Sequence, residues 1–395
     1  MMILATRNKK CMAPQVISHS LRMLGVVFIS LALGSKGFAF ETTARQAILV
    51  DSLTGSILLE KDSDVPAPPA SLSKLMTSYM VFEEIEKGAL SLEDELPVSE
   101  KAWRMGGSKM FVEVGDKVSV EDLLRGVIVQ SGNDACIVLA ETIAGSESAF
   151  SDLMTDRAHD MGMLNSTFTN STGWPDPEHR MSARDIALLT QRTIIDFPQF
   201  FPYFAEKEFT YNGIRQGNRN PLLYKNIGAD GMKTGHTKEA GYSLAATAVR
   251  NGRRLILVLI GLDSARQRSI EAERIFDYGF RKFTNYNLFD KGEIVESADI
   301  WLGELSRVPL VLEEGLTITL PRDARKNLTV TVAFESPIPA PVEEGEVLAK
   351  LVIKTSDSGA MEFPLVAGNS VPRAGPFKRI TGALSYMLFG PALDE

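Results

Sequence analysis

The stretch Pro69-Ala70-Ser71-Leu72-Ser73-Lys74-Leu75-Met76-Thr77 combines a helix start with a serine and a lysine placed for chemistry. The prolines just before it disfavour helix, and the apolar residues that follow predict a helix from about Ala70. Ser71 and Lys74 stand three positions apart, so on a helix they share one face and the ammonium can approach the hydroxyl. A lysine whose pKa is lowered by burial or by another cation can take the proton from a serine nucleophile. Ser73 is a rival hydroxyl, but it points away from the Lys74 face.

Two more short motifs follow in order. Ser131-Gly132-Asn133 falls in a turn between helices expected at residues 120–129 and 136–143. Its hydroxyl could pass a proton to a leaving amine and its amide could hold a substrate carbonyl. Lys233-Thr234-Gly235 precedes a strand expected at residues 242–249, where a cation and a hydroxyl at a strand edge can bind a carboxylate. Gly235 permits close backbone approach.

Each motif alone also fits a plain structural interpretation. Ser71 would then cap a helix above a solvated Lys74, Asn133 would cap the next helix, and Lys233 would be a surface lysine at a turn. The order of the three motifs and their expected places on a helix, a turn and a strand favour a shared catalytic cleft over three coincidences.

The first folded unit is predicted to be α+β. Strand-like runs at residues 46–50 and 56–59 form a hairpin, and a second hairpin joins residues 242–249 to 255–260 through Asn251-Gly252. We expect both hairpins to share one antiparallel sheet with helices on its faces and a helical lobe inserted between them. Ser182 is expected to cap a helix over residues 185–195. Another helix, residues 266–283, is expected to turn four side chains inward: Ile270, Ile275, Phe276 and Phe280.

A smaller unit is expected after a boundary near residues 285–291, so the catalytic unit is placed at residues 40–285. Short β-like runs at residues 310–312, 316–320, 328–334 and 347–353 predict an all-β domain over residues 291–371. Pro337–Pro341 is interpreted as an exposed loop. From Phe377, apolar residues recur at helical spacing beside Lys378 and Arg379, which predicts an amphipathic helix over residues 375–390. That helix either lies on a membrane, the interpretation favoured here, or docks on the β domain.

The N-terminus is typical of a secretory signal, residues 1–39, with basic residues, a short apolar run and small residues before an expected cleavage after Ala39. An uncleaved amphipathic anchor is the alternative. Of two cysteines, Cys11 would leave with the signal, so Cys136 has no partner for an internal disulfide and is expected to pack in the core. The net charge of −8 provides no global positive field for nucleic acid. The four histidines show no metal-ligand spacing, and no cofactor is expected.

The three motifs together resemble the signature set of penicillin-binding proteins and serine β-lactamases. The longer stretches around them, Ser131 to Ala135 and Asp230 to Thr237 among them, are most similar to the low-molecular-mass D-alanyl-D-alanine carboxypeptidases, the penicillin-binding protein 5/6-like members of peptidase family S11. The resemblance spans nearly the whole mature chain. It implies a transpeptidase-like catalytic domain, a peptidoglycan stem peptide ending in D-Ala-D-Ala as substrate, β-lactams as covalent ligands, and a place at the periplasmic face of the inner membrane.

The resemblance also implies residue roles. Ser71 is the nucleophile, Lys74 the general base and Ser131 the proton relay. The substrate is expected to contact the remaining positions, which are Asn133, Lys233, Thr234, Gly235, His236, Arg219 and Arg268. The backbone N–H groups of Ser71 and His236 are expected to form the oxyanion hole. Trp174 and His179, in the loop after Asn165, are interpreted as packing residues.

Two rival functions share the fold. A class A β-lactamase would carry a dedicated glutamate between the second and third motifs, and the surroundings of Glu178 do not match that pattern. A non-catalytic penicillin-binding sensor would be expected to lack a motif residue, yet all are present. Endopeptidase cleavage of cross-links stays open.

Overall fold

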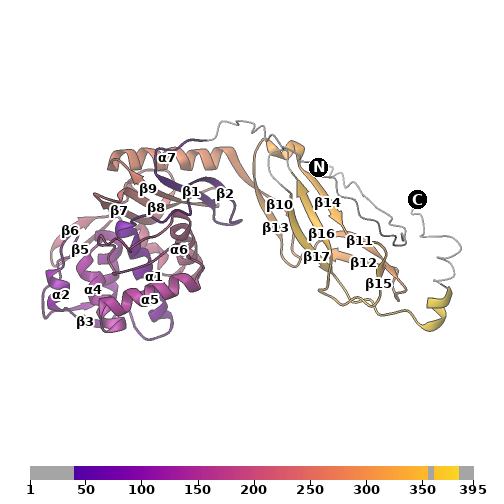
Figure 1. The fold of residues 1–395 in the computed structure, drawn as a ribbon, viewed down its shortest axis with the longest axis horizontal. Coiled ribbons are helices and arrows are strands. Elements are labelled where there is room, and N and C mark those ends of the chain that lie inside the picture. The colour runs from indigo at the N-terminus through magenta and orange to yellow at the C-terminus, as the bar shows by residue number, and fades with distance from the viewer. Residues whose placement is uncertain (1–39, 355–359, 382–395) are drawn as a thin grey trace, which may run out of the picture. The chain divides into compact units, whose positions relative to one another are not determined.

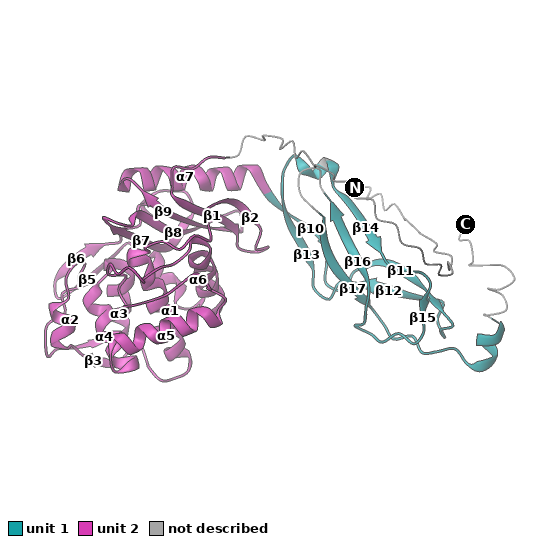
Figure 2. Ribbon diagram, in the orientation of Figure 1, with its two compact units in different colours: residues 1–38, 284–395 teal, residues 39–283 magenta. Residues whose placement is uncertain are grey.

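The computed structural model describes residues 40–354 and 360–381, which divide into two compact units with the boundary between Phe283 and Thr284 (Figure 2). The expected signal segment, residues 1–39, lies outside the described residues. So does most of the expected C-terminal helix, of which residues 376–381 are helical and exposed.

The first unit is built on a five-stranded antiparallel sheet (Figure 1). In spatial order its strands are β2 (Ile57–Lys61), β1 (Gln46–Asp51), β9 (Arg253–Leu262), β8 (Gly241–Arg250) and β7 (Ala229–Thr237). Strands from both ends of the unit share the sheet, so this expectation is confirmed. Asn251 and Gly252 both have positive φ between β8 and β9, as a tight two-residue hairpin requires. Strand β7 was not predicted, and it forms one edge.

Helices cover both faces of this sheet and fill the inserted lobe (Figure 1). The longer ones are α1 (Lys74–Glu86), α2 (Glu100–Arg104), α3 (Val120–Arg125), α4 (Asn133–Ala144), α5 (Glu147–Asp160), α6 (Ala183–Asp196) and α7 (Ala265–Lys282). Single turns are η1 (Ala70–Ser73), η2 (Gly126–Gln130), η3 (Phe201–Ala205) and η4 (Pro221–Tyr224), and two small hairpins pair β3 (Glu95–Pro97) with β4 (Lys117–Ser119) and β5 (Glu208–Tyr211) with β6 (Ile214–Gly217). The Ser182 hydroxyl caps α6 by accepting from the Asp185 N–H, as predicted.

Strand β9 explains why its sequence is almost wholly apolar. Ile256 and Val258 face the core shared with α1, α4 and α6, whereas Leu255 and Leu257 face α7. Both faces of this central strand are therefore buried. One prediction for α7 is wrong, because Ile270 is 52% exposed. The buried stripe runs through Arg268, Glu271, Ala272, Ile275, Phe276 and Gly279. Ile270 lies about 200° around the helix from Ala272, at 100° per residue, and so faces solvent.

The second unit is all-β. A six-stranded sheet has the order β14 (Thr329–Ala333), β16 (Val347–Lys354), β17 (Met361–Ala367), β12 (Arg307–Val311), β11 (Ile294–Trp301) and β15 (Ile338–Pro339), and β10 (Phe283–Phe289) pairs with β13 (Leu316–Pro321). A short turn, η5 (Ala324–Asn327), follows β13. The stretch 285–291 is thus largely a strand. Pro337–Pro341 is not simply an exposed loop, because Ile338 is buried and β15 pairs with β11.

Candidate active site

Ser71 and Lys74 lie where the sheet meets the helical lobe. Ser71 is in η1 and half-buried, and Lys74 begins α1 with only 1% of its surface exposed. The Lys74 Nζ donates to Ser71 Oγ at 3.1 Å and to the Thr172 carbonyl at 2.5 Å. The expected approach of the ammonium to the hydroxyl is therefore seen, and a main-chain oxygen supplies a second contact that no side-chain pattern predicts.

Burial is the main reason why the pKa of Lys74 falls from 10.5 to about 8. The charge of Arg219 lowers it further, while the carboxylate of Asp134 opposes the shift. At neutral pH a useful fraction of Lys74 is then neutral and able to accept a proton. Cys136 is buried and free, and its Sγ contacts the Gly132 carbonyl at 3.2 Å. Burial raises the pKa of this thiol to about 12, so it packs as an apolar group.

Ser131 ends η2 in a left-handed conformation, with φ of 62°. Its Oγ is buried, and no described residue forms a hydrogen bond with it. Within the expected turn the left-handed residue is thus Ser131, whereas Gly132 has an ordinary φ of −61°; a Cβ at Gly132 would lie 2.8 Å from the Asp134 carboxylate. Asn133 does not cap α4. It is the first residue of that helix, and its amide donates to the Gly106 carbonyl at 2.8 Å.

Lys233, Thr234 and Gly235 lie within β7, the edge strand, rather than in a turn before β8. Gly235 touches the turn that carries Ser71, since a Cβ there would come within 2.8 Å of the Pro69 carbonyl. This contact brings one face of β7 against η1. His236 is exposed and stacks on Tyr242 with ring centroids 3.9 Å apart.

The site carries several cations. Lys233 is buried, and its pKa lies well below the ordinary value because of burial and then the charges of Lys74 and Arg219. The Arg219 guanidinium donates to Ser108 Oγ at 2.5 Å. Arg268, on α7, is buried with its Nε unpaired among the described residues, and burial lowers its pKa to about 10. Mutual repulsion of this kind is relieved by an anion, so the arrangement suits a carboxylate-bearing ligand.

The loop from Thr169 to His179 is a part of the site that the motifs did not reveal. Asn170 Oδ1 accepts from the backbone N–H groups of Thr172, Gly173 and Trp174, which fixes the turn. Glu147 accepts from the Ser171 N–H and hydroxyl, and the Thr77 hydroxyl donates to the Ser171 carbonyl at 2.6 Å. These bonds aim the Thr172 carbonyl at Lys74. Only the short polar residues of this stretch give a sequence signal, and that signal is common to many loops.

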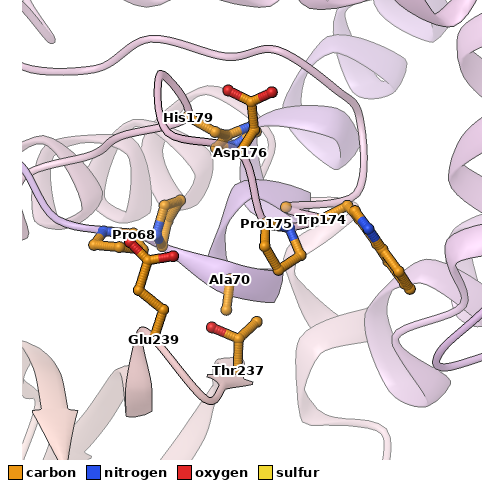
Figure 3. Close-up of a pocket in the computed structure, with 10 residues that line it drawn as sticks. Pro68, Ala70, Trp174, Pro175, Asp176, His179, Thr237 and Glu239 are labelled. Atoms are coloured by element: carbon orange, nitrogen blue, oxygen red, sulfur yellow. The ribbon is translucent and has the colours of Figure 1, made fainter.

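A small pocket of about 10 Å³ lies beside η1. Figure 3 shows Ala70 between Pro175 of the loop and Thr237 at the end of β7. It has room for about one water molecule, so it does not hold a peptide. The open edge of β7 is the surface on which an extended chain can pair. In the described part of the chain no group of three or more His, Cys, Asp or Glu side chains is placed to hold a metal ion.

Comparison with known proteins agrees with this geometry. Residues 35–264 match the family model described as D-alanyl-D-alanine carboxypeptidase, and residues 283–373 match the C-terminal domain of penicillin-binding protein 5. D-alanyl-D-alanine carboxypeptidase DacC of Escherichia coli is 39% identical over 85% of this chain and 86% of its own length. Penicillin-binding protein 5 from Haemophilus influenzae has a TM-score of 0.78 at 35% identity, covering 84% of this chain and 98% of its own.

A third solved structure is that of penicillin-binding protein D2 from Listeria monocytogenes in its ampicillin-bound form. Its TM-score is 0.56 at 29% identity, and the match covers 61% of this chain and 98% of the other. The catalytic unit is thus shared more widely than the β domain. By family model, sequence identity and fold alike, this chain belongs to the D-alanyl-D-alanine carboxypeptidases of peptidase family S11.

Proposed function

We propose that this chain removes the terminal D-alanine from peptidoglycan stem peptides through an acyl-enzyme on Ser71. The observation that carries the proposal is the buried Lys74, whose Nζ lies 3.1 Å from Ser71 Oγ and whose pKa is lowered to about 8. Lys74 takes the hydroxyl proton while Ser71 Oγ attacks the carbonyl of the penultimate D-alanine. The bond to the terminal D-alanine then breaks, and water later hydrolyses the ester.

Ser131 is assigned to the proton transfer. Its buried hydroxyl has no hydrogen-bond partner among the described residues, so it is free to bond with a substrate group. In the proposed mechanism Ser131 helps pass the proton from Lys74 to the nitrogen of the departing D-alanine. The D-alanine then leaves with a neutral amino group rather than as a nitrogen anion. Asn133, held by the Gly106 carbonyl, orients the acyl chain.

The cation cluster is assigned to the substrate carboxylate. Lys233 and Thr234 bind it from strand β7, with Arg268 and Arg219 contributing positive charge. Gly235 and His236 belong to the strand edge on which the peptide lies, and the backbone N–H groups of His236 and Ser71 form the oxyanion hole. A carboxylate-terminated peptide is then held with its last amide bond at Ser71.

The test uses purified protein and its Ser71→Ala variant, each with a fluorescent penicillin and with a pentapeptide ending in D-Ala-D-Ala. Labelling of the native protein and release of D-alanine, both lost in Ser71→Ala, support the proposal. Labelling without D-alanine release would indicate a sensor or a cross-linked substrate. Rapid release of hydrolysed penicillin would indicate a β-lactamase. An unlabelled native protein would contradict the assignment of Ser71.

Attachment to a membrane surface is also part of the proposal, with export by an N-terminal signal and residence at the periplasmic face of the inner membrane. The support is the short helix at residues 376–381, where Phe377 is 88% exposed and Ile380 is 65% exposed. No helix among the described residues is long and apolar enough to cross a bilayer.

Truncation after Gly375 tests the anchor. Val371 and Ala374 are buried in the β unit and are kept, so the cut spares the fold. The shortened chain should stay in solution when mixed with anionic lipid vesicles, whereas the full mature chain should sediment with them. The full chain with Phe377→Asp and Ile380→Asp should behave like the truncation. Equal sedimentation of all three forms would show that this segment is not the anchor.

A further inference from the structure

A chain of hydrogen bonds runs beneath the nucleophile, from the loop to the start of η1. The Thr169 N–H donates to His179 Nδ1 at 3.2 Å, and His179 Nε2 lies 2.7 Å from Ser73 Oγ. Ser73 Oγ in turn donates to the Ala70 carbonyl at 3.1 Å. Both side chains are buried; from the sequence, His179 was interpreted as a packing residue and Ser73 as a rival hydroxyl that points away from Lys74.

The donors and acceptors assign one direction to this chain. Since the Ser73 hydroxyl gives its proton to the Ala70 carbonyl, it must accept from His179, so Nε2 carries the hydrogen and Nδ1 is the acceptor for Thr169. His179 is therefore a neutral imidazole, in agreement with a pKa that burial lowers to about 4. Every polar atom of the chain has a partner, which makes it a rigid link.

The last acceptor in this series of hydrogen bonds, the Ala70 carbonyl, connects it to Ser71. The carbonyl of Ala70 and the N–H of Ser71 belong to the same planar peptide unit, so fixing one fixes the direction of the other. Ala70 has a φ of 50°, a region that non-glycine residues rarely adopt. A peptide in that conformation needs outside contacts to hold it, and the Ser73 hydroxyl supplies one.

The loop supplies a second contact on the same oxygen. Gly173 has a φ of +77°, and a Cβ there would stand 1.8 Å from the Ala70 carbonyl oxygen. The backbone at Gly173 thus closes the space into which that carbonyl could otherwise turn. His179 and Gly173 come from one loop, so the loop meets this peptide unit through a hydrogen-bond chain and through close packing.

We propose that Ser73 and His179 are positioning residues that hold the Ala70–Ser71 peptide with its N–H toward the developing oxyanion. The inference rests on the proposed function, in which the Ser71 N–H is one donor of the oxyanion hole. Neither side chain touches the substrate. Their effect falls on the rate at which Ser71 is acylated, because an oxyanion donor acts on the transition state more than on bound substrate.

The experiment measures acylation by a fluorescent penicillin, recording the rate constant at saturation, the half-saturating concentration and the final labelled fraction. Ser73→Ala removes the middle of the chain, and Ser78→Ala is the matched control. Ser78 is also buried and close by on α1, but its hydroxyl has no hydrogen-bond partner in the described part of the chain. The two variants delete the same atom from buried positions five residues apart.

We expect Ser73→Ala to lower the rate constant roughly tenfold or more, below the hundred- to thousandfold loss that removal of a whole oxyanion donor causes. The half-saturating concentration and the labelled fraction should stay within about twofold, as should all three quantities in Ser78→Ala. A merely structural role would reduce the labelled fraction and not the rate of the molecules that remain. A Ser73→Ala rate constant within twofold of the native one would overturn the proposal.

Two further variants keep the test decisive if Ser73→Ala folds poorly. His179→Gln keeps an N–H donor for Ser73, so it should retain more of the acylation rate than His179→Ala. Combining Ser73→Ala with His179→Ala should cost no more than the larger single loss, because both act through one link. If the two losses of acylation rate multiplied in the double variant, Ser73 and His179 would not act through one link. Equal acylation rates for His179→Gln and His179→Ala would also contradict the link. Failure of the native protein to label at all would instead contradict the proposed function.

Discussion

The pH dependence of acylation follows from the burial of Lys74. In the proposed mechanism Lys74 must be neutral to accept the Ser71 proton, and its pKa is lowered to about 8. With that value about one-tenth of Lys74 is neutral at pH 7, about half at pH 8 and about nine-tenths at pH 9. The second-order acylation rate constant should therefore rise about fivefold from pH 7 to pH 8 and only about twofold from pH 8 to pH 9.

The assay is the labelling rate at low concentrations of fluorescent penicillin between pH 6 and pH 9. Under this condition the rate reports the ionisation of the free protein, which is the state described here. A lysine with its ordinary pKa of 10.5 would instead give a rise of about tenfold per pH unit over the whole range. Burial and the charges of Lys74 and Arg219 lower the pKa of Lys233, so loss of the proton that attracts the carboxylate opposes the rise as the pH increases.

One substitution moves this profile in a known direction. The charge of Arg219 lowers the pKa of Lys74, so Arg219→Gln should shift the rising limb to higher pH, besides weakening substrate binding. Arg215→Gln is the control, because Arg215 is an exposed arginine of the same region, on β6, and pairs with Glu208. A rate that is flat from pH 6 to pH 9, or a shift of the Arg219→Gln profile to lower pH, would refute the assignment of Lys74 as the base.

Three predictions concern stability. The pKa of Lys74 is lowered from 10.5 to about 8, so its charged form is disfavoured in the folded chain. Lys74→Met should therefore raise the free energy of unfolding at pH 7, measured with urea, by up to about 3 kcal/mol. The same variant should not be labelled by penicillin. The pKa of His179 is lowered from 6.5 to about 4, so between these pH values the unfolded chain binds more protons than the folded chain. Up to about 3 kcal/mol of the free energy of unfolding is therefore lost as the pH falls from 6.5 to 4. Urea unfolding of His179→Gln should lack this loss. Gly173→Ala should lower stability by about 1–3 kcal/mol more than Gly145→Ala, since both have positive φ but only Gly173 faces a close oxygen; equal melting temperatures would contradict the close contact.

Sequence reasoning was strongest where the chemistry is local. The spacing of Ser71 and Lys74 places them on one turn whatever the rest of the chain does, and Asn251-Gly252 determines its own hairpin. Predictions that relied on distant contacts were weaker. Strand β7 was missed because it carries a buried lysine and two glycines, residue types that disfavour strand by propensity. Ile270 was placed inward by hydrophobicity alone, although the buried stripe of α7 includes Arg268 and Glu271.

Two contacts near the site that the sequence did not predict are made by main-chain carbonyls. The Thr172 carbonyl accepts from Lys74. It cannot be recognised in the sequence, because every type of residue has a backbone carbonyl. The same holds for the Ala70 peptide, whose orientation depends on Ser73 and on a loop about a hundred positions later. The motifs identify the side chains proposed to react. The groups that orient them can be found only from the three-dimensional position of the loop.

In the proposed mechanism, the buried cations that serve the reaction also lower the stability of the folded chain. Lys74 is buried where water cannot solvate its charge, and Lys233 is buried beside it with two arginines near, so the folded chain holds cations that repel one another. A substrate carboxylate neutralises part of that charge when it binds, which favours peptides that end there over longer ones. Carboxylate binding also raises the pKa of nearby lysines. A bound carboxylate therefore relieves part of the repulsion between the buried cations, and the free energy lost to burial is recovered partly as selectivity for a terminal carboxylate.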